Sequence, residues 1–140
     1  MKNYVDLSFC IGEYNDITHQ ELTELLGLEP IKVYVKGEPK HPHHPATWSS
    51  NRWYYKPALE EFASFDEQME AIYDVLTARK EVLKPICERY YCELSCEVFI
   101  YADSEESTPW IHLGTKYNDL VKELNIEFDV DIMFFAAAEG

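Results

Sequence analysis

Apolar and polar residues alternate in several short segments of the chain, and this period of two predicts strands whose faces differ in burial. The longest such segment is residues 91–101, whose apolar face contains Leu94 and Val98 and whose polar face contains Glu93. The predicted strands cover residues 4–11, 31–35, 47–55, 91–101, 110–113 and 126–135. The pattern therefore predicts a sheet of about six strands with one buried face.

Helical spacing of apolar residues predicts three helices between these strands. Thr18 with Glu21, and Ser64 with Glu67, have the spacing of a capping box, in which the hydroxyl and the carboxylate close the first turn of a helix. Pro85 is expected to kink the second helix or to begin a new one. The predicted helices cover residues 18–26, 64–80 and 115–124.

The predicted order of elements is therefore β-α-β-β-α-β-β-α-β. Strands with one apolar face, mixed with a few helices, indicate an α+β fold of ferredoxin-like character. We expect a mostly antiparallel sheet with the helices packed on one face and the other face open. No linker composition or repeat divides residues 1–140, so we expect a single domain.

Charge narrows the range of partners. The 140 residues include 26 acidic and 12 basic side chains, which gives a formal net charge of −14. Such a charge repels nucleic-acid phosphates and anionic lipid, so neither nucleic acid nor a membrane is an expected partner. The first residues lack the apolar stretch of a secretory signal, and a cytoplasmic location with free, buried cysteines is expected.

The negative charge is concentrated in the last third of the chain. Residues 93–140 carry −9, whereas residues 30–56 carry +4. Glu93 and Glu97 share one strand face, and Glu127, Asp129 and Asp131 share the corresponding face of the last strand. If those strands are neighbours, the carboxylates form one surface that is either simply solvated or recognises a cationic partner. Paired carboxylates also serve in glycoside hydrolysis, but an open sheet face lacks the cleft that such sites need.

A proline-rich loop holds three histidines, His41, His43 and His44. Imidazoles are good ligands for zinc, copper or nickel, which makes these residues weak candidates for a metal site. Their spacing matches no established three-ligand site, and an extended loop is the ordinary interpretation. We therefore predict no bound metal and no cofactor.

Aromatic residues gather in the third predicted strand, close to basic residues. Trp48, Trp53 and Tyr55 are candidates for a surface that binds a small ligand or a peptide. The alternative is an ordinary strand whose aromatic rings pack against the second helix. No glycine-flanked serine, glycine-rich phosphate loop or activated thiol is present, so no catalytic residue is predicted.

Several strings resemble the bacterial family catalogued as domain of unknown function 4279. The matching strings are Ile17, Glu21-Leu22-Thr23-Glu24-Leu25-Leu26-Gly27-Leu28-Glu29-Pro30, Lys36-Gly37, Thr47-Trp48-Ser49-Ser50, the long helix, Glu93-Leu94-Ser95-Cys96 and Phe128-Asp129-Val130-Asp131-Ile132. The resemblance extends from about residue 4 to 135, and it departs at the histidine loop and at Trp53-Tyr54-Tyr55. It implies the fold and a bacterial origin, and it supplies no catalytic residue.

The leading hypothesis is a non-enzymatic module that binds another protein through an acidic face, as small immunity-type or regulatory proteins do. Its expected partner has a basic surface. An alternative is a ligand-binding or enzymatic domain that uses the aromatic strand and the histidine loop. A further alternative is a structural homodimer joined through sheet edges.

Overall fold

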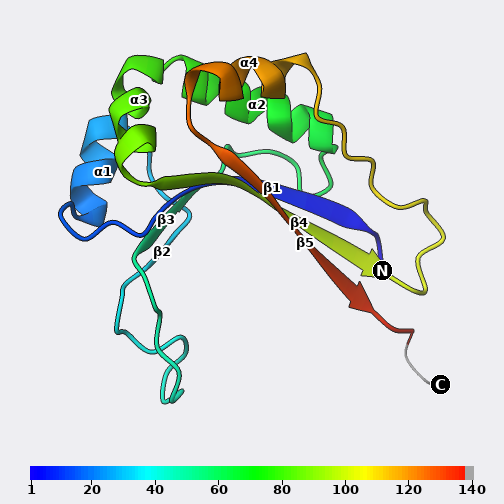
Figure 1. Ribbon diagram of the computed structural model, residues 1–140. Coiled ribbons are helices and arrows are strands. Elements are labelled where there is room, and N and C mark those ends of the chain that lie inside the picture. Colours follow the sequence, from blue (N-terminus) through cyan, green and yellow to red (C-terminus); the bar gives the residue numbers. More distant parts are fainter. Residues whose placement is uncertain (138–140) are drawn as a thin grey trace.

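The computed structural model describes residues 1–137, which form one five-stranded sheet and four helices. The strands are β1 (Tyr4–Gly12), β2 (Lys32–Tyr34), β3 (Arg52–Tyr55), β4 (Tyr91–Tyr101) and β5 (Glu127–Phe135). The helices are α1 (His19–Leu26), α2 (Phe65–Thr77), α3 (Lys80–Arg89) and α4 (Thr115–Glu123). The α+β class is confirmed. The helices lie on one side of a strongly curved sheet (Figure 1).

The sheet is mixed, with three antiparallel strand pairs and one parallel pair. Its strand order is β2-β3-β1-β4-β5, and the last pair, β4 with β5, is parallel. Two parallel neighbours need a crossover connection, and α4 provides it between these two strands. The prediction of six strands in a mostly antiparallel sheet is not matched, because residues 110–113 form no strand and α4 therefore connects β4 to a parallel neighbour, β5.

Two of the predicted strands differ in the structure. Residues 110–113 form no strand, and Trp110 and Leu113 are exposed in a segment that leads to α4. The strand predicted at 47–55 is reduced to β3, and Thr47 forms only an isolated bridge with Pro39. Alternation predicts which residues can form a strand, but a strand also needs a neighbour to bond with, and these segments lack one along most of their length.

The long second helix is divided in two, so the predicted order of elements is wrong there as well. Arg79 leaves helical geometry, and its guanidinium donates to the carbonyls of Leu26 at 2.7 Å and Val75 at 3.1 Å. The arginine thereby satisfies carbonyls at the C-terminal ends of both α1 and α2. Pro85 lies inside α3, which begins five residues earlier, at Lys80.

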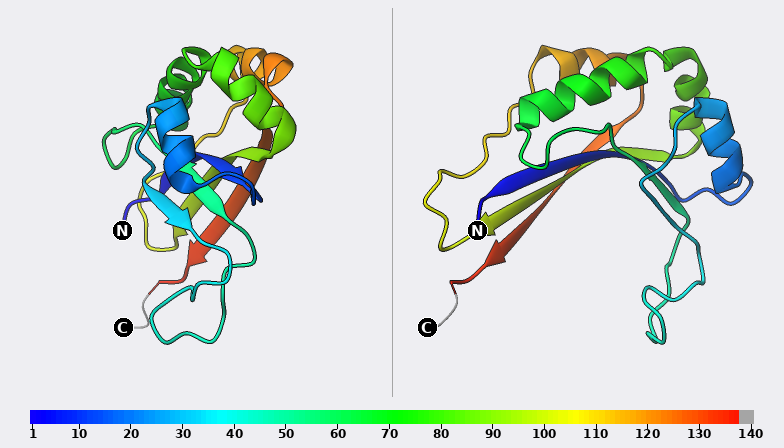
Figure 2. Two further views of the ribbon diagram at one scale, coloured as in Figure 1. Left: turned by 90° about the vertical axis from the view of Figure 1, so that its left-hand side faces the viewer. Right: turned by 180° about the vertical axis from the view of Figure 1, so that it is seen from behind.

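The hydrophobic core lies between the sheet and the helices (Figure 2). Alternate residues of β1 and β4, among them Phe9 and Leu94, point into it. Both predicted capping boxes are confirmed, at Thr18 and Ser64. Free, buried cysteines are confirmed too, as none of the four is in a disulfide.

A buried glutamine completes the sheet where a strand is missing. β3 pairs with β1 only from Phe9 to Gly12, which leaves the first half of β1 without a neighbour on that side. The Gln68 side chain fills the position: its amide oxygen accepts from Leu7 N–H and its amide nitrogen donates to Val5 C=O, both at 2.8 Å. The side-chain amide therefore makes the bonds of a strand backbone.

Candidate binding face

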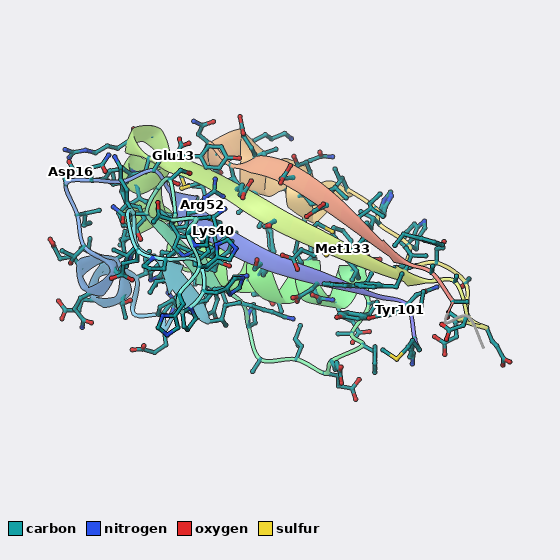
Figure 3. The ribbon with its side chains drawn as sticks, turned by 90° about the horizontal axis from the view of Figure 1, so that it is seen from below. Glu13, Asp16, Lys40, Arg52, Tyr101 and Met133 are labelled. Carbon is teal, nitrogen blue, oxygen red and sulfur yellow. The ribbon has the colours of Figure 1, made fainter. Side chains whose placement is uncertain are left out.

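The side of the sheet opposite the helices, here called the open face, is covered by no helix in residues 1–137 (Figure 1). A long excursion between β2 and β3, residues 35–51 and here called the arm, projects away on this same side (Figure 2). The view onto the open face has Lys40 and Arg52 toward one end and Tyr101 and Met133 toward the other (Figure 3). The open face is therefore bordered by two different groups of side chains.

Carboxylates occupy the middle of the open face. In the β4–β5 register, Glu93 lies opposite Glu127 and Glu97 opposite Asp131, and the next strand, β1, places Asp6 opposite Glu97. Together these side chains, here called the acidic centre, are Asp6, Glu93, Glu97, Glu127, Asp129 and Asp131. The structure thus makes β4 and β5 neighbours, which is the condition on which the shared acidic surface depended.

Two of these carboxylates have cations of their own. Glu93 is only 4% exposed, and it accepts hydrogen bonds from the Arg52 guanidinium at 3.3 Å and from the Tyr91 hydroxyl at 2.7 Å. Burial and the bond to Glu93 raise the pKa of Tyr91, so the phenol remains a donor. Asp6 forms an ion pair with Lys56.

The other four carboxylates have no such partner in the described part of the chain. No lysine or arginine nitrogen among residues 1–137 lies within 4.0 Å of the carboxylates of Glu97, Glu127, Asp129 or Asp131. The β5 carboxylates are exposed, whereas Glu97 is half-buried. Residues 1–137 bring together no set of three or more histidine, cysteine or carboxylate side chains suited to holding a metal ion. These four members of the acidic centre thus have negative charge without a counter-charge among the described residues.

Stacked rings border the acidic centre at one end. Tyr4 stacks on Phe99 with ring centroids 4.3 Å apart, and Tyr101 stacks on Phe135 at 4.8 Å. These rings are half-buried or exposed. Aromatic rings of this kind, beside a charged surface, are common at the centres of protein interfaces.

The opposite end is basic and is formed by the arm and β3. Tyr34 stacks on Trp48 at 3.7 Å, and the Lys40 ammonium lies 5.2 Å from the Trp48 ring centroid. Asn51 holds the arm in place, because its side chain accepts from the backbone N–H of Lys36 at 2.9 Å and donates to the carbonyl of Tyr14 at 2.7 Å. The positive segment of the sequence thus lies at a defined end of the open face.

The three aromatic residues predicted as a ligand surface do not lie together. Trp48 is half-buried on the arm, whereas Trp53 is fully buried under α1 and donates from its indole N–H to the Thr23 hydroxyl at 3.1 Å. Tyr55 lies on the same side of β3 as Trp53 and packs against the core. Residues two apart in a strand face the same side, so Trp53 and Tyr55 both face the core, whereas Trp48 lies outside β3 on the arm.

Sequence reasoning missed three residues that shape the open face, Asp6, Arg52 and Tyr54. Arg52 and Tyr54 alternate with Trp53 along β3, so the alternation could have placed them on the open face once Trp53 was assigned to the core. Cys10 points to the same face yet is buried, in contact with Arg52 and Tyr54. Their side chains close this part of the face over the thiol.

The histidine loop is at the exposed tip of the arm. The rings of His41 and His44 are 5.6 Å apart between centroids, and the His44 Nδ1 accepts from the backbone N–H of Ala46 at 3.0 Å. His43 has a left-handed backbone with φ of 62°. These contacts fix the shape of the turn.

A family model described as Domain of unknown function (DUF4279) matches residues 2–135. No curated protein and no solved structure matches the chain. Among the helices of residues 1–137, none is long and apolar enough to cross a bilayer.

Proposed function

The chain belongs to the DUF4279 family, whose description assigns no activity, and we propose that it is a non-enzymatic protein that binds another protein through the open face. The partner presents a basic surface. One observation carries the proposal: four carboxylates without internal counter-charges, Glu97, Glu127, Asp129 and Asp131, lie on two neighbouring strands of a face that no helix of residues 1–137 covers.

The energetics of the free protein support an external counter-charge. Like charges that lie opposite each other on neighbouring strands destabilise a sheet. A partner with lysine or arginine side chains at these positions converts the repulsion into attraction. Clustered charge also accelerates the encounter of two proteins, an effect that falls as salt is added.

The two ends of the open face carry different side chains, which supports a single orientation of the bound partner. The acidic centre lies between the stacked rings of Tyr4 and Phe99 at one end and Arg52 and Lys40 at the other. Rings contribute apolar contact area, whereas charges determine which partner is accepted. We propose that the chain acts as an immunity-type or regulatory protein, in the cytoplasm of a bacterium.

Affinity capture with matched variants tests the proposal. One bait combines Glu97→Lys, Asp129→Lys and Asp131→Lys in the acidic centre. The control bait combines Glu29→Lys, Glu60→Lys and Glu88→Lys, which are exposed and lie outside the open face. Both baits change the net charge by the same amount, so any difference between them reports on position rather than on total charge.

The expected result is a protein retained by the wild-type and control baits, released by salt and absent from the acidic-centre bait. Capture of the same proteins by all three baits, or a bound protein that is insensitive to both salt and the acidic-centre variant, would contradict binding through the acidic centre.

A further inference from the structure

The outer edge of β5 presents backbone N–H and C=O groups that face away from the sheet. β5 has β4 as its only neighbour among the strands of residues 1–137. The N–H of Ala102, which follows β4, donates to the Phe135 carbonyl at 2.9 Å, so the backbone of Phe135 faces β4. Backbone groups alternate in direction along a strand, hence those of Val130, Ile132 and Phe134 face away from the sheet.

The side chains at these outward positions are apolar and exposed. Val130 is 44% exposed, and Ile132 and Phe134 are each 66% exposed. β5 contains no lysine and no proline, which are the residues that commonly protect an edge strand from pairing. By contrast, Gln68 caps the unpaired half of β1. The fold therefore closes one free stretch of strand and leaves another open.

The charge of β5 argues against a second copy of this chain as the occupant. Asp129 and Asp131 project from β5 onto the open face, between the outward-facing residues. Two β5 strands paired about a two-fold axis would place these aspartates next to those of the other copy, and like charges at such positions are destabilising. Basic side chains at the same positions would be attracted.

We propose that the β5 edge from Val130 to Phe134 binds an extended segment of the partner, which adds a strand to the sheet. Apolar residues of that segment cover Ile132 and Phe134, and alternating lysine or arginine residues lie beside Asp129 and Asp131. Backbone hydrogen bonds give the affinity and the alternating side chains give the specificity, as in strand addition generally. The inference rests on the proposed function, because it assigns part of the partner's contact with the acidic face.

Two synthetic peptides of identical composition test strand addition by titration calorimetry at low salt. In one peptide lysine alternates with valine, and in the other the lysines are grouped before the valines. Both have the same charge, but only the alternating peptide can present valines to one side of the sheet and lysines to the other. The expected result is at least about tenfold tighter binding of the alternating peptide.

The substitution Ile132→Pro tests the same edge from the side of the protein. Its proline removes an N–H that faces outward, so the β4–β5 bonds stay intact while the docking edge loses a donor. Ile132→Lys, at the same exposed position, keeps the backbone and adds a repelling charge. Each variant is expected to abolish the preference for the alternating peptide, whereas Ile132→Val retains it.

Three outcomes would overturn strand addition. Equal affinity for both peptides, unchanged in Ile132→Pro and Ile132→Lys, would show charge attraction alone and would leave the acidic-face proposal standing. Failure of both peptides to bind would exclude the edge, while the capture experiment decides the acidic face separately. A wild-type dimer in light scattering that Ile132→Lys converts to a monomer would identify a second copy as the occupant.

Discussion

Glu93 shows how a residue predicted to lie on a solvated face becomes buried. It does alternate with the core residues of β4, as its sequence position indicates, but Arg52 and Tyr91 reach over it from the same face. Burying a carboxylate is unfavourable unless it is paired and hydrogen-bonded, and both conditions are met. Glu93 therefore holds Arg52 in place, and the exposed members of the acidic centre are the ones available to a partner.

The first prediction concerns the ion pair between Arg52 and Glu93. Arg52→Met is expected to lower the free energy of unfolding by about 2 kcal/mol, because it leaves a buried carboxylate without its cation and the arginine is only partly exposed. Adding Glu93→Gln to Arg52→Met is expected to recover part of the loss. Urea unfolding of the two single variants and the double variant measures this coupling, and additive effects of the two substitutions would contradict it.

The second prediction concerns the thiols. Burial raises the pKa of both Cys10 and Cys96 to about 11, from an ordinary 9.0. A thiol with a raised pKa ionises first in the unfolded chain, so the free energy of unfolding is expected to decrease as the pH rises from 9 toward 11. A thiol reagent at pH 8 should react slowly with the native chain and should titrate four cysteines after denaturation. Rapid native-state labelling would contradict the burial of the thiols.

At the scale of the element, alternation and capping signals predicted β1, β4, β5 and the starts of α1 and α2, because each depends on a local period or on a side chain three residues away. Pairing is not local. The segment 110–113 alternates but finds no neighbour, and the parallel β4–β5 pair follows from the crossover through α4. The acidic surface could be predicted only on the condition that those strands are neighbours.

Gln68 illustrates what no local pattern reveals, and it carries the third prediction. Gln68→Met keeps the size of the side chain but leaves the N–H of Leu7 and the carbonyl of Val5 without partners, which is expected to cost about 2–4 kcal/mol. Gln20→Met is the control, since Gln20 is exposed on α1 and its side chain donates to the neighbouring Glu24 carboxylate. Equal midpoints of thermal unfolding for the two variants would contradict the role assigned to Gln68.

The fourth prediction concerns the edge of β5. The amide protons of Ile132 and Phe134 face outward and are expected to exchange quickly with solvent, whereas those of Asp131 and Met133 face β4 and are expected to be protected. Residue-resolved hydrogen exchange by NMR measures this alternation. Uniform protection along β5 would show that something already occupies the edge in the free protein.

At the scale of the whole molecule, the net charge of −14 conceals a polarised surface. The helices and the core occupy one side of the sheet (Figure 1). The open face runs from the basic arm through the acidic centre to the stacked rings, and Lys40 and Tyr101 mark its two ends in Figure 3. A partner can therefore be oriented as well as attracted. Trp53 and Tyr55 contribute to the core rather than to this surface.

The most direct test of binding through the open face, and the fifth prediction, is carboxylate footprinting of the chain with and without a protein retained in the capture experiment. A carbodiimide couples glycine ethyl ester to accessible carboxylates, and mass spectrometry measures the coupling at each residue. We expect coupling at Glu97, Asp129 and Asp131 to fall in the complex while coupling at Glu60 and Glu88 stays the same. Unchanged coupling at Glu97, Asp129 and Asp131, together with protection of carboxylates on the helices, would contradict binding through the open face.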